Sequence, residues 1–492
     1  MDVVLWNSGP ANTRHLPSKL DYIVFRTLGP YKISHATRNA GYTSQVIDHI
    51  NWMNEDELYN CTSKFIDNET AILGISTTFL MADTHELPVH VLNVLHRLTE
   101  QFPNLHIVFG GYQARDPALR NVIKCKFSII LEYGEDSFVE LLEHRKGKGK
   151  LPPFTLISKP WGDFKVFKTP LVQKFDIEKD DHMFTDQDCI LPNETLPIEI
   201  SRGCIFKCKF CNHLMLGRGK LDYLRSMDCI KKELIHNYEK WKITNYYVIC
   251  DTFNDTEYKM QEWHKMVTSL PFKIQYTAYL RADLLDRYPD VPYLLKDSGL
   301  ISCYHGIESF GSGAQAVGKG WGSKKAKDYL PKLYHDIWGG EVLQTLSFIV
   351  GLPGDTRETF IETLDWFEKN NMHHIAIHNL GINNNKFNKH LSEFDLNAEN
   401  YGYTFPRPER PWVWKNDYWD HDQVDIFINE QYPRINKMSS WYGSWIVLML
   451  MQHGFDKSFF KKEISRTVFT LGQLNHLAKG QIQTYIKKLL AL

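Results

Sequence analysis

Three cysteines in the middle of the chain stand close enough together to hold a metal cluster. Cys204, Cys208 and Cys211 lie within eight residues, in the spacing Cys-x3-Cys-x2-Cys. A cubane of four irons and four sulfurs usually takes four cysteine ligands, so a loop that supplies three leaves one iron with an open coordination position. An open iron can bind and reduce a small molecule, whereas a structural site is normally closed. The spacing therefore predicts a reactive iron–sulfur centre.

Two simpler interpretations of these cysteines remain open. A zinc site needs four ligands, and His213 is a candidate for the fourth. All four ligands would then fall within ten residues, without the two separated pairs that structural zinc sites usually show. The cysteines could also be three buried structural residues. A zinc site or a closed cluster would make the chain an interaction module and not an enzyme.

The composition is that of an ordinary globular protein with room for several domains. Of 492 residues, 43% are hydrophobic and 23% are charged, and the formal net charge is -1. At roughly 100–200 residues per domain, such a chain holds about two to four domains. The near-neutral balance disfavours nucleic acid as a partner, because no basic field is present to attract it.

The cysteine usage and the N-terminus indicate an intracellular protein. Nine cysteines in a chain of this length are too sparse for a disulfide scaffold. The N-terminus lacks a charged segment followed by a long apolar run, as a signal peptide would have. The longest apolar stretch, residues 445–451, is far shorter than the roughly 20 residues that span a bilayer. We therefore expect a cytoplasmic protein without a membrane span.

The first 150 residues alternate between strand-like and helix-like segments. Apolar runs predict strands at residues 3–6, 44–48, 71–76, 106–109 and 128–131. Apolar side chains at helical spacing predict helices at residues 32–41 and 86–101, and another follows Gly134 and Glu135. Such alternation is typical of a doubly wound parallel sheet covered on both faces. These sheets bind ligands beyond the carboxyl ends of their strands.

A second alternating series covers residues 196–380. Strands are predicted at residues 198–201, 246–250, 274–280, 301–307, 343–350 and 374–379, with helices between them. The last helix is expected to start at an acidic cap, Asp355, with Glu358 three residues further on. Six strand–helix repeats predict a partial (βα)6 barrel, in which chemistry takes place at the carboxyl ends of the strands. The cysteine loop follows the first of these strands.

Two segments outside the alternating series suggest the domain boundaries. Residues 146–153 (Lys-Gly-Lys-Gly-Lys-Leu-Pro-Pro) mark a boundary or, alternatively, a long surface loop. We expect domains at residues 1–150 and 196–380, joined by an irregular linker at 151–195. Residues 381–492 form a mostly helical C-terminal region that could cap the barrel and shape a substrate pocket. Its aromatic residues are equally compatible with ordinary packing, and include Trp412, Trp414, Trp419, Trp441, Tyr442 and Trp445.

The cysteine spacing, with the aromatic Phe210 before the last cysteine, resembles the radical S-adenosylmethionine (SAM) superfamily. Four later segments resemble that family's strand-end motifs and come in the family's order. They are residues 248–253 (Val-Ile-Cys-Asp-Thr-Phe), 279–283 (Tyr-Leu-Arg-Ala-Asp), 306–309 (Gly-Ile-Glu-Ser) and 348–356 (Phe-Ile-Val-Gly-Leu-Pro-Gly-Asp-Thr). Each motif is short, and their combination over residues 196–380 carries the resemblance.

The resemblance implies a 4Fe-4S cluster on the three cysteines, with the amine and carboxylate of SAM chelating the open iron. An electron from a reductant such as flavodoxin or ferredoxin would break a sulfonium–carbon bond. The products would be methionine and a 5′-deoxyadenosyl radical, which abstracts hydrogen from an unactivated carbon.

The resemblance also implies which residues bind SAM. Asp251 and Glu308 would contact its amine or ribose, with Ser309 in the same region, and Arg281 would meet its carboxylate. Gly351 would let the backbone approach adenine closely. Each of these could instead be a structural residue at a strand end. The full set implied for SAM is Phe210, Asp251, Arg281, Glu308, Ser309 and Gly351.

The first 150 residues are similar to the cobalamin-binding domain that precedes the barrel in one radical SAM class. The similarity rests on residues 26–30, 41–48, 74–78, 109–111 and 133–135. It implies a corrin site at the strand ends, formed by Ser76, Thr77, Gly110, Gly111, Gly134 and Glu135. One departure is the motif Asp-x-His-x-x-Gly of many cobalamin proteins. Asp83 and His85 match it only in part, lack its glycine, and follow the third strand instead of the first.

The implied reaction is cobalamin-dependent methylation of an unactivated carbon in a small-molecule or peptide substrate. An alternative is an enzyme of the same architecture that catalyses ring closure or oxidation without cobalamin. Methylthiolation is disfavoured, because it needs a third cysteine set and residues 1–150 contain only Cys61 and Cys125, far apart.

Overall fold

The computed structural model describes residues 1–9, 24–80, 87–115, 123, 125–131, 133–159, 162–168, 177, 182–211, 224–319, 321–382, 392–440, 443–455 and 468–492. His213, Asp83, His85, Trp441 and Tyr442, which the sequence analysis singled out, lie outside these ranges. The chain divides into two compact units. The first, here called the N-terminal unit, consists of Met1–Pro197, Glu233–Ile243 and Ile464–Leu492. The second, here called the barrel unit, consists of Ile198–Lys232 and Thr244–Glu463.

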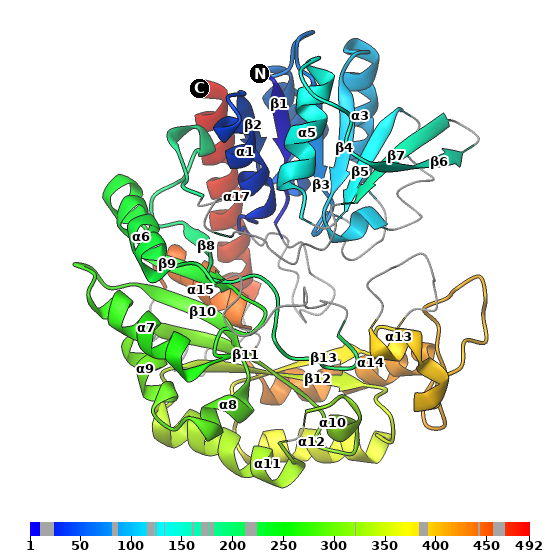
Figure 1. The fold of residues 1–492 in the computed structure, drawn as a ribbon. Helices are drawn as coiled ribbons and strands as arrows, with labels where there is room; N and C mark the ends of the chain where they lie inside the picture. Colours follow the sequence, from blue (N-terminus) through cyan, green and yellow to red (C-terminus); the bar gives the residue numbers. More distant parts are fainter. Residues whose placement is uncertain are drawn as a thin grey trace. The chain divides into compact units, whose positions relative to one another are not determined.

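The N-terminal unit is built on a seven-stranded sheet in the order β2-β1-β3-β4-β5-β7-β6 (Figure 1). Its strands are β1 (Val3–Trp6), β2 (Ser44–Ile47), β3 (Ile72–Ser76), β4 (His106–Gly110), β5 (Phe127–Leu131), β6 (Phe154–Lys159) and β7 (Gly162–Lys168). All neighbours pair in parallel except β6 and β7. Because β2 and β3 lie on opposite sides of β1, the strand order reverses there, as in doubly wound folds.

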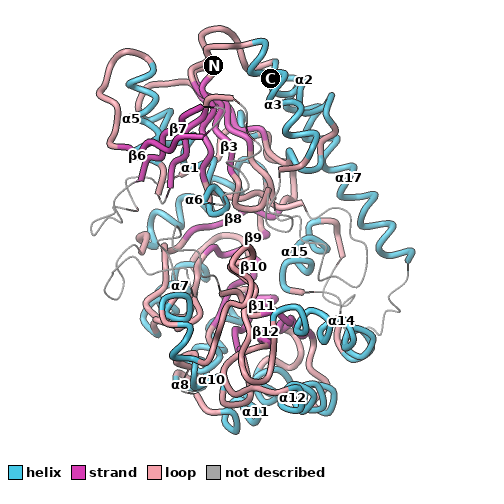
Figure 2. Tube along the Cα trace, turned by 90° about the vertical axis from the view of Figure 1, so that its right-hand side faces the viewer, coloured by secondary structure: helices cyan, strands magenta, loops and turns pink. Residues whose placement is uncertain are grey.

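Helices cover both faces of this sheet. Helices α1 (Gly29–Asn39) and α5 (Glu135–Arg145) pack together on one face, and α2 (Glu55–Ser63) and α3 (Val89–Gln101) on the other (Figure 2). In α3 the buried residues Val91, Val94, Leu95 and Leu98 form one stripe. Such a stripe, set against strands that are buried along their whole length, explains why these segments form helices and strands at the predicted places.

The structure differs from the expected irregular linker at residues 151–195. Strands β6 and β7 form an antiparallel hairpin that extends the N-terminal sheet, with Ile129 of β5 beside Val166. Phe164, Val166 and Phe167 of β7 are buried while Lys165 is not, so the apolar side chains of this strand are covered. The alternation from Phe164 to Val166 is present in the sequence, but it is short and stands between stretches of mixed composition.

The C-terminal helix α17 (Val468–Ala491) belongs to the N-terminal unit. Its buried residues Ala478, Ile482, Tyr485, Ile486 and Leu489 join the same core as α2 and α3. The helix is also held by polar contacts, because Gln483 donates to Glu57 at 2.7 Å and Lys488 donates to the Ile190 carbonyl at 2.8 Å. Residues 381–492 are therefore divided between the two units, whereas the sequence analysis treated them as one region.

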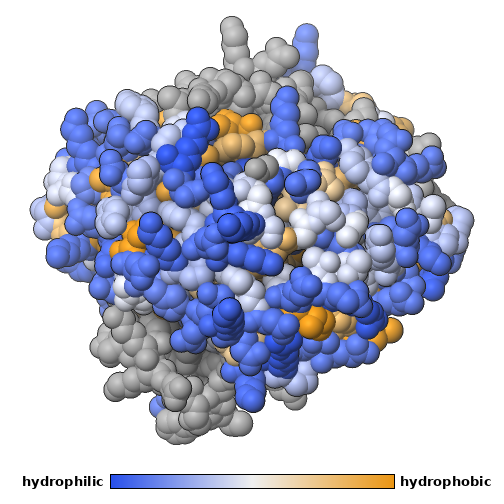
Figure 3. All heavy atoms as spheres, turned by 90° about the horizontal axis from the view of Figure 1, so that it is seen from below, coloured by the Kyte–Doolittle hydropathy of each residue, from blue (hydrophilic) through white to orange (hydrophobic). Residues whose placement is uncertain are grey.

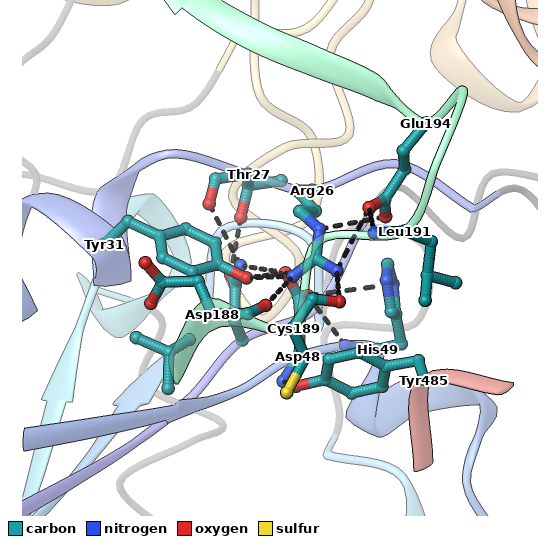
Figure 4. A network of polar contacts seen from close by, with 12 residues as sticks. Arg26, Thr27, Tyr31, Asp48, His49, Asp188, Cys189, Leu191, Glu194 and Tyr485 are labelled. Carbon is teal, nitrogen blue, oxygen red and sulfur yellow. Dashed lines mark hydrogen bonds and ion pairs between the residues drawn. The ribbon is translucent and has the colours of Figure 1, made fainter. Parts of the chain in front are cut away.

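A buried charged network ties together distant parts of the N-terminal unit (Figure 4). The guanidinium of Arg26 is fully buried and donates to Glu194 from Nε at 2.9 Å and from Nη2 at 3.2 Å. It also donates to the carbonyl oxygens of Asp188 and Cys189 at 3.0 and 3.2 Å. The hydroxyl of Tyr485 accepts the backbone N–H of Asp48 at 2.8 Å. This network fixes residues 188–194, and also α17, against the end of β2.

The barrel unit is built on a six-stranded parallel sheet in the order β13-β12-β11-β10-β9-β8. The strands are β8 (Thr195–Glu199), β9 (Asn245–Ile249), β10 (Gln275–Leu280), β11 (Leu300–Glu308), β12 (Leu343–Val350) and β13 (His374–Asn379). Chain order and sheet order coincide, as in a (βα) barrel or a part of one. The connecting helices are α6 (Met227–Trp241), α7 (Glu257–Thr268), α8 (Ala282–Arg287), α9 (Val291–Asp297), α10 (Gly313–Ala316), α11 (Ser323–Pro331) and α12 (Arg357–Lys369).

Two C-terminal helices complete the barrel unit. Helix α14 (His421–Met438) packs on β13 and α12, and α15 (Ser444–Gln452) crosses β9, β10, β11 and β12. The Ser444 hydroxyl donates to the Cys303 carbonyl at 2.8 Å and lies 3.1 Å from the Thr345 hydroxyl. Because Cys303 and Thr345 are in the first halves of β11 and β12, α15 begins at the amino-terminal half of the sheet.

The start of α12 differs from the predicted cap by one residue. Thr356 is the N-cap and forms a reciprocal capping box with Thr359. The Asp355 side chain instead accepts the backbone N–H of Gly313 at 3.0 Å. Asp355 therefore stabilises the turn after β11, a long-range contact that no local pattern near Asp355 indicates.

The face drawn in Figure 3 is mostly hydrophilic, with apolar side chains in small separate patches. Single exposed apolar residues of this kind are normal on globular proteins. Among the helices in the described ranges, none combines the length and the apolar character needed to cross a membrane.

Candidate active site

The cysteine loop leaves the carboxyl end of β8. Arg202 bonds Glu199 at 2.7 Å, and Gly203 adopts φ +71°, a left-handed conformation that suits glycine and turns the chain into the loop. Two backbone bonds then hold Lys209, whose N–H donates to Val317 at 3.1 Å and whose carbonyl accepts from Phe394 at 3.0 Å. The three cysteines are half-buried and form no disulfides. The loop is thus anchored while its thiols stay accessible.

Residues that follow two neighbouring strands lie beside the thiols. Thr252, after β9, places its hydroxyl 3.2 Å from Cys204 Sγ. Arg281, after β10, directs Nη1 toward Cys208 Sγ at 3.8 Å. Burial raises the pKa of the Cys208 thiol, and the nearby cations Lys319 and Arg281 oppose that rise. A positive environment favours the thiolate form that binds iron.

In the described part of the chain, no group of three or more His, Cys, Asp or Glu side chains gathers tightly enough to hold a single metal ion. A cubane cluster makes a different demand, because it attaches each cysteine to a separate iron. The N–H of Cys211 donates to the carbonyl of Cys208 at 3.0 Å, so one turn of chain joins the last two cysteines.

Arg281 is held in place from four directions. Its Nε and Nη2 donate to the two carboxylate oxygens of Asp283 at 3.0 and 2.7 Å. Its backbone N–H and carbonyl pair with the amide side chain of Asn254 at 2.8 and 2.9 Å. The guanidinium lies over the ring of Phe206, 4.0 Å from the ring centre. The expected contact with a SAM carboxylate stays a prediction, and the structure adds a contact with Cys208.

Glu308 ends β11 in an unusual backbone conformation. Its φ is +69°, and the register of β11 shifts against β12 between Gly306 and Glu308. Lys319 donates to the Glu308 carboxylate and to the Gly306 carbonyl, each at 2.6 Å. A side chain at Gly306 would collide with both Glu308 and Lys319, which explains the glycine. A non-glycine residue in this conformation is strained, and such strain is often found at functional sites.

A hollow lies beside Glu308 at the ends of β11 and β12. Ser309 lines it, and its hydroxyl accepts the N–H of Gly311 at 2.7 Å. Burial raises the pKa of the Asp355 carboxyl, and hydrogen bonds from Ser309 and Gly313 oppose that rise. The lining residues are Glu308, Ser309, Phe348, Ile349, Val350, Gly351, Asp355, Thr356, Thr359, Phe360, Thr363 and Trp419.

Gly351 has a close neighbour within the protein. Its φ is +101°, and a Cβ there would come within 2.3 Å of the Trp414 ring. The Gly351 carbonyl accepts the Tyr403 hydroxyl at 2.7 Å and the Asn416 amide at 3.2 Å. The glycine thus permits packing of the C-terminal aromatic region, and its predicted approach to adenine remains a prediction.

Polar side chains line the face of the barrel sheet that carries α15. The Tyr304 hydroxyl lies 2.8 Å from His378 Nε2, which joins β11 to β13. The rings of Tyr279 and Tyr304 contact each other with centres 5.2 Å apart. Tyr304 also interacts electrostatically with Glu308, so this aromatic face continues toward the strand ends.

The predicted SAM residues follow successive strands. Phe210 is in the cysteine loop, Asp251 follows β9 and is exposed, and Arg281 follows β10. Glu308 ends β11, Ser309 comes next, and Gly351 follows β12. Thr252, Phe206 and Lys319 were not predicted as site residues. The first two lie within recognised motifs, whereas Lys319 lies eleven residues beyond Glu308 in the chain and carried no local signal.

The residues expected at the cobalamin site lie at strand ends of the N-terminal sheet. The N–H and hydroxyl of Thr77 both donate to the Gly110 carbonyl at 2.8 Å, which joins the ends of β3 and β4. Gly111 has φ +91°, and a Cβ there would meet Thr78 at 2.5 Å. Ser76 ends β3, while Gly134 and Glu135 begin α5. Thr77, Gly110 and Gly111 form one group, which Ser76 adjoins in sequence. Gly134 and Glu135 form a second group.

Known proteins share both parts of this architecture. The family model of the Radical SAM superfamily matches residues 198–367. The radical SAM methyltransferase TsrM from Kitasatospora setae, solved with cobalamin and a [4Fe-4S] cluster, is similar with a TM-score of 0.61 and 11% identity. That similarity covers 98% of this chain and 100% of TsrM.

The cobalamin-dependent radical SAM enzyme OxsB, solved with aqua-cobalamin, is similar with a TM-score of 0.57 and 15% identity. The similarity covers 82% of this chain and 56% of OxsB. No curated protein matches the sequence.

Residues 198–367 form a radical SAM domain. Its fold, a doubly wound parallel sheet together with a partial barrel, is the fold of the cobalamin-dependent enzymes TsrM and OxsB. The predictions of a radical SAM domain and of this fold are thereby confirmed.

Proposed function

We propose that this protein is a cobalamin-dependent radical SAM enzyme that methylates an unactivated carbon. The observation that carries the proposal is the loop of Cys204, Cys208 and Cys211 at the end of β8, with Thr252, Arg281 and Lys319 around its thiols. The fold similarity to TsrM and OxsB supports the cobalamin part. We further propose a cytoplasmic location and a flavodoxin or ferredoxin as the electron donor.

The residues at the strand ends fit the cluster and SAM. Three half-buried thiols in a positive environment suit a cluster with one open iron. When bound, the cluster and SAM supply hydrogen abstraction, and cobalamin supplies a methyl group. Glu308, held by Lys319, offers a carboxylate to the SAM amine or ribose, and Ser309 lies next to it. Phe210, Asp251, Arg281 and Gly351 complete the proposed SAM site.

For cobalamin we propose the strand ends of the N-terminal sheet. The bonds of Thr77 to Gly110 leave Gly110 and Gly111 as a turn without side chains, which a flat ring could approach closely. Ser76, Thr77, Gly134 and Glu135 would contribute hydrogen-bonding groups. This placement accords with ligand binding at the carboxyl ends of strands in doubly wound sheets.

For the substrate we propose the polar face of the barrel sheet. The hydrogen bond between Tyr304 and His378 fixes a donor–acceptor pair, and the Tyr279 ring adds a flat apolar surface. A small molecule or peptide with a ring and a hydrogen-bonding group would fit this face. TsrM has been solved with tryptophan as its substrate, which is a compound of that kind.

Anaerobic reconstitution tests the proposal. We expect the wild-type protein to hold about four irons and four sulfides per chain, to bind cobalamin, and to form 5′-deoxyadenosine from SAM with a low-potential reductant. Cys208→Ala should abolish 5′-deoxyadenosine formation and leave the far-UV circular dichroism unchanged. Cys229→Ala, in α6, is the matched control and should behave as wild type.

Three outcomes would contradict parts of the proposal. One zinc per chain and no iron would overturn the enzyme. Undiminished SAM cleavage in Cys208→Ala would overturn the cluster ligands. Production of 5′-deoxyadenosine by a protein that binds no cobalamin would contradict the proposed methylation and indicate another radical reaction.

A further inference from the structure

We propose that Arg281 tunes the reduction potential of the iron–sulfur cluster through an N–H···S hydrogen bond to Cys208, with Asp283 fixing the guanidinium in place. The inference rests on the proposed function only in needing a cluster on the three cysteines. In this structure the Cys208 thiol sulfur stands for the thiolate sulfur that would be bound to iron.

One nitrogen of the Arg281 guanidinium, Nη1, is left to hydrogen-bond to the Cys208 sulfur. Asp283 takes Nε and Nη2 as a fork, so Nη1 is the group that faces Cys208 at 3.8 Å. The Phe206 ring lies against the guanidinium, and Asn254 clamps the backbone. Since the Arg281 side chain is only 11% exposed, solvent screens its charge weakly.

The charge acts on the redox step in a definite direction. One electron from the reductant converts the oxidised cluster to the reduced cluster, which gains one negative charge while no bond is broken. A fixed cation beside a ligating sulfur stabilises the reduced form and raises the potential, since hydrogen bonds to sulfur and net charge both set cluster potentials. Asp283 opposes this effect, because its negative charge lies beside the guanidinium.

Lys319 is the other cation that influences Cys208, but its ammonium is engaged elsewhere. It bonds the Glu308 carboxylate and the Gly306 carbonyl, each at 2.6 Å. Within the described residues, Arg281 is the side chain that hydrogen-bonds to the Cys208 sulfur. Arg281 is therefore the residue to which we assign the tuning.

The experiment is a potentiometric titration of the reconstituted protein, without SAM or substrate, followed by EPR of the reduced cluster. Arg281→Gln should shift the ratio of reduced to oxidised cluster at a fixed potential about tenfold toward the oxidised form, which is about 59 mV for a one-electron couple. Asp283→Asn should shift the ratio in the opposite direction. Arg287→Gln, an exposed position in the same helix α8, is the control for the loss of one charge and should match wild type.

The opposite potential shifts expected for Arg281→Gln and Asp283→Asn allow the proposal to be tested even if one variant incorporates little cluster. In that case Arg281→Lys, which keeps the charge and loses the fork, should give a smaller shift than Arg281→Gln. Equal potentials in wild type, Arg281→Gln and Asp283→Asn, or shifts of the same sign, would overturn the tuning role and leave the proposed function intact. A wild-type protein that cannot hold a cluster would instead overturn the proposed function.

Discussion

The ammonium of Lys319 lies 2.6 Å from the carboxylate of Glu308, and both side chains are largely buried. Glu308 stands at φ +69°, where a strand of the barrel ends beside the cysteine loop. A strained residue held by a buried ion pair keeps one carboxylate in a fixed position. The pair thus links two elements, β11 and the segment after α10, at the proposed SAM site.

This pair predicts how SAM binding responds to mutation. Glu308→Gln should weaken SAM binding by about 10- to 150-fold, because a hydrogen bond to a charged group contributes about 1.5–3 kcal/mol. Lys319→Met should weaken it as well and lower the melting temperature, since it leaves a buried carboxylate without its partner. Equilibrium dialysis with labelled SAM measures both effects. Lys324→Met, at an exposed position in α11, is the control, and wild-type affinity in both test variants would contradict the assignment.

Substitutions at Gly351 and Gly402 separate the energetic cost of a strained backbone from the cost of a steric clash. Both have positive φ, +101° and +81°, but a Cβ at Gly351 would strike Trp414 while Gly402 faces open space. Gly402→Ala should cost about 1–2 kcal/mol for the left-handed backbone alone. Gly351→Ala should cost about 1–3 kcal/mol more, because the core must shift around the added methyl group. Thermal unfolding measures the difference, and equal losses would refute the close packing of Trp414.

The Arg26 network should make a large and cooperative contribution to stability. Arg26→Met leaves Glu194 buried without its cation and should cost about 3–5 kcal/mol. The double variant Arg26→Met with Glu194→Leu should lose less than the sum of the two single variants, because the residues contact each other. Denaturant unfolding monitored by fluorescence gives the coupling energy. Arg434→Met removes an exposed ion pair and should cost at most about 1 kcal/mol.

His305 should make the barrel unit less stable in mild acid. Burial lowers the pKa of His305 to about 4, so between about pH 6.5 and 4 the unfolded chain binds a proton there that the folded chain does not. The free energy of unfolding therefore falls as the pH falls, by about 1 kcal/mol from pH 7.5 to 5.5 for this residue. His305→Gln should reduce the pH dependence by that amount. His335→Gln, an exposed histidine, should leave it unchanged, and an unaltered pH profile in His305→Gln would contradict this account.

The sequence predicted those features that local patterns encode. Apolar runs such as Leu343–Val350 and His374–Asn379 became strands with the predicted bounds, and the cysteine loop follows β8 as expected. The hairpin of β6 and β7, the place of α17 and the cap at Thr356 were not anticipated. Distant partners explain part of this, because Asp355 is drawn to Gly313 and Tyr485 to Asp48. Lys319 was missed for the same reason, because only the folded barrel brings it to Glu308.

The place of α17 has a consequence for synthesis in the cell. A ribosome synthesises β1, α2 and α3 long before it translates codons 468–491. Until then, the N-terminal unit lacks the part of its hydrophobic core that α17 contributes. Premature stop codons near the 3′ end of the message would thus damage the half of the protein encoded at the 5′ end. We expect the nascent chain to depend on chaperones until α17 has been synthesised.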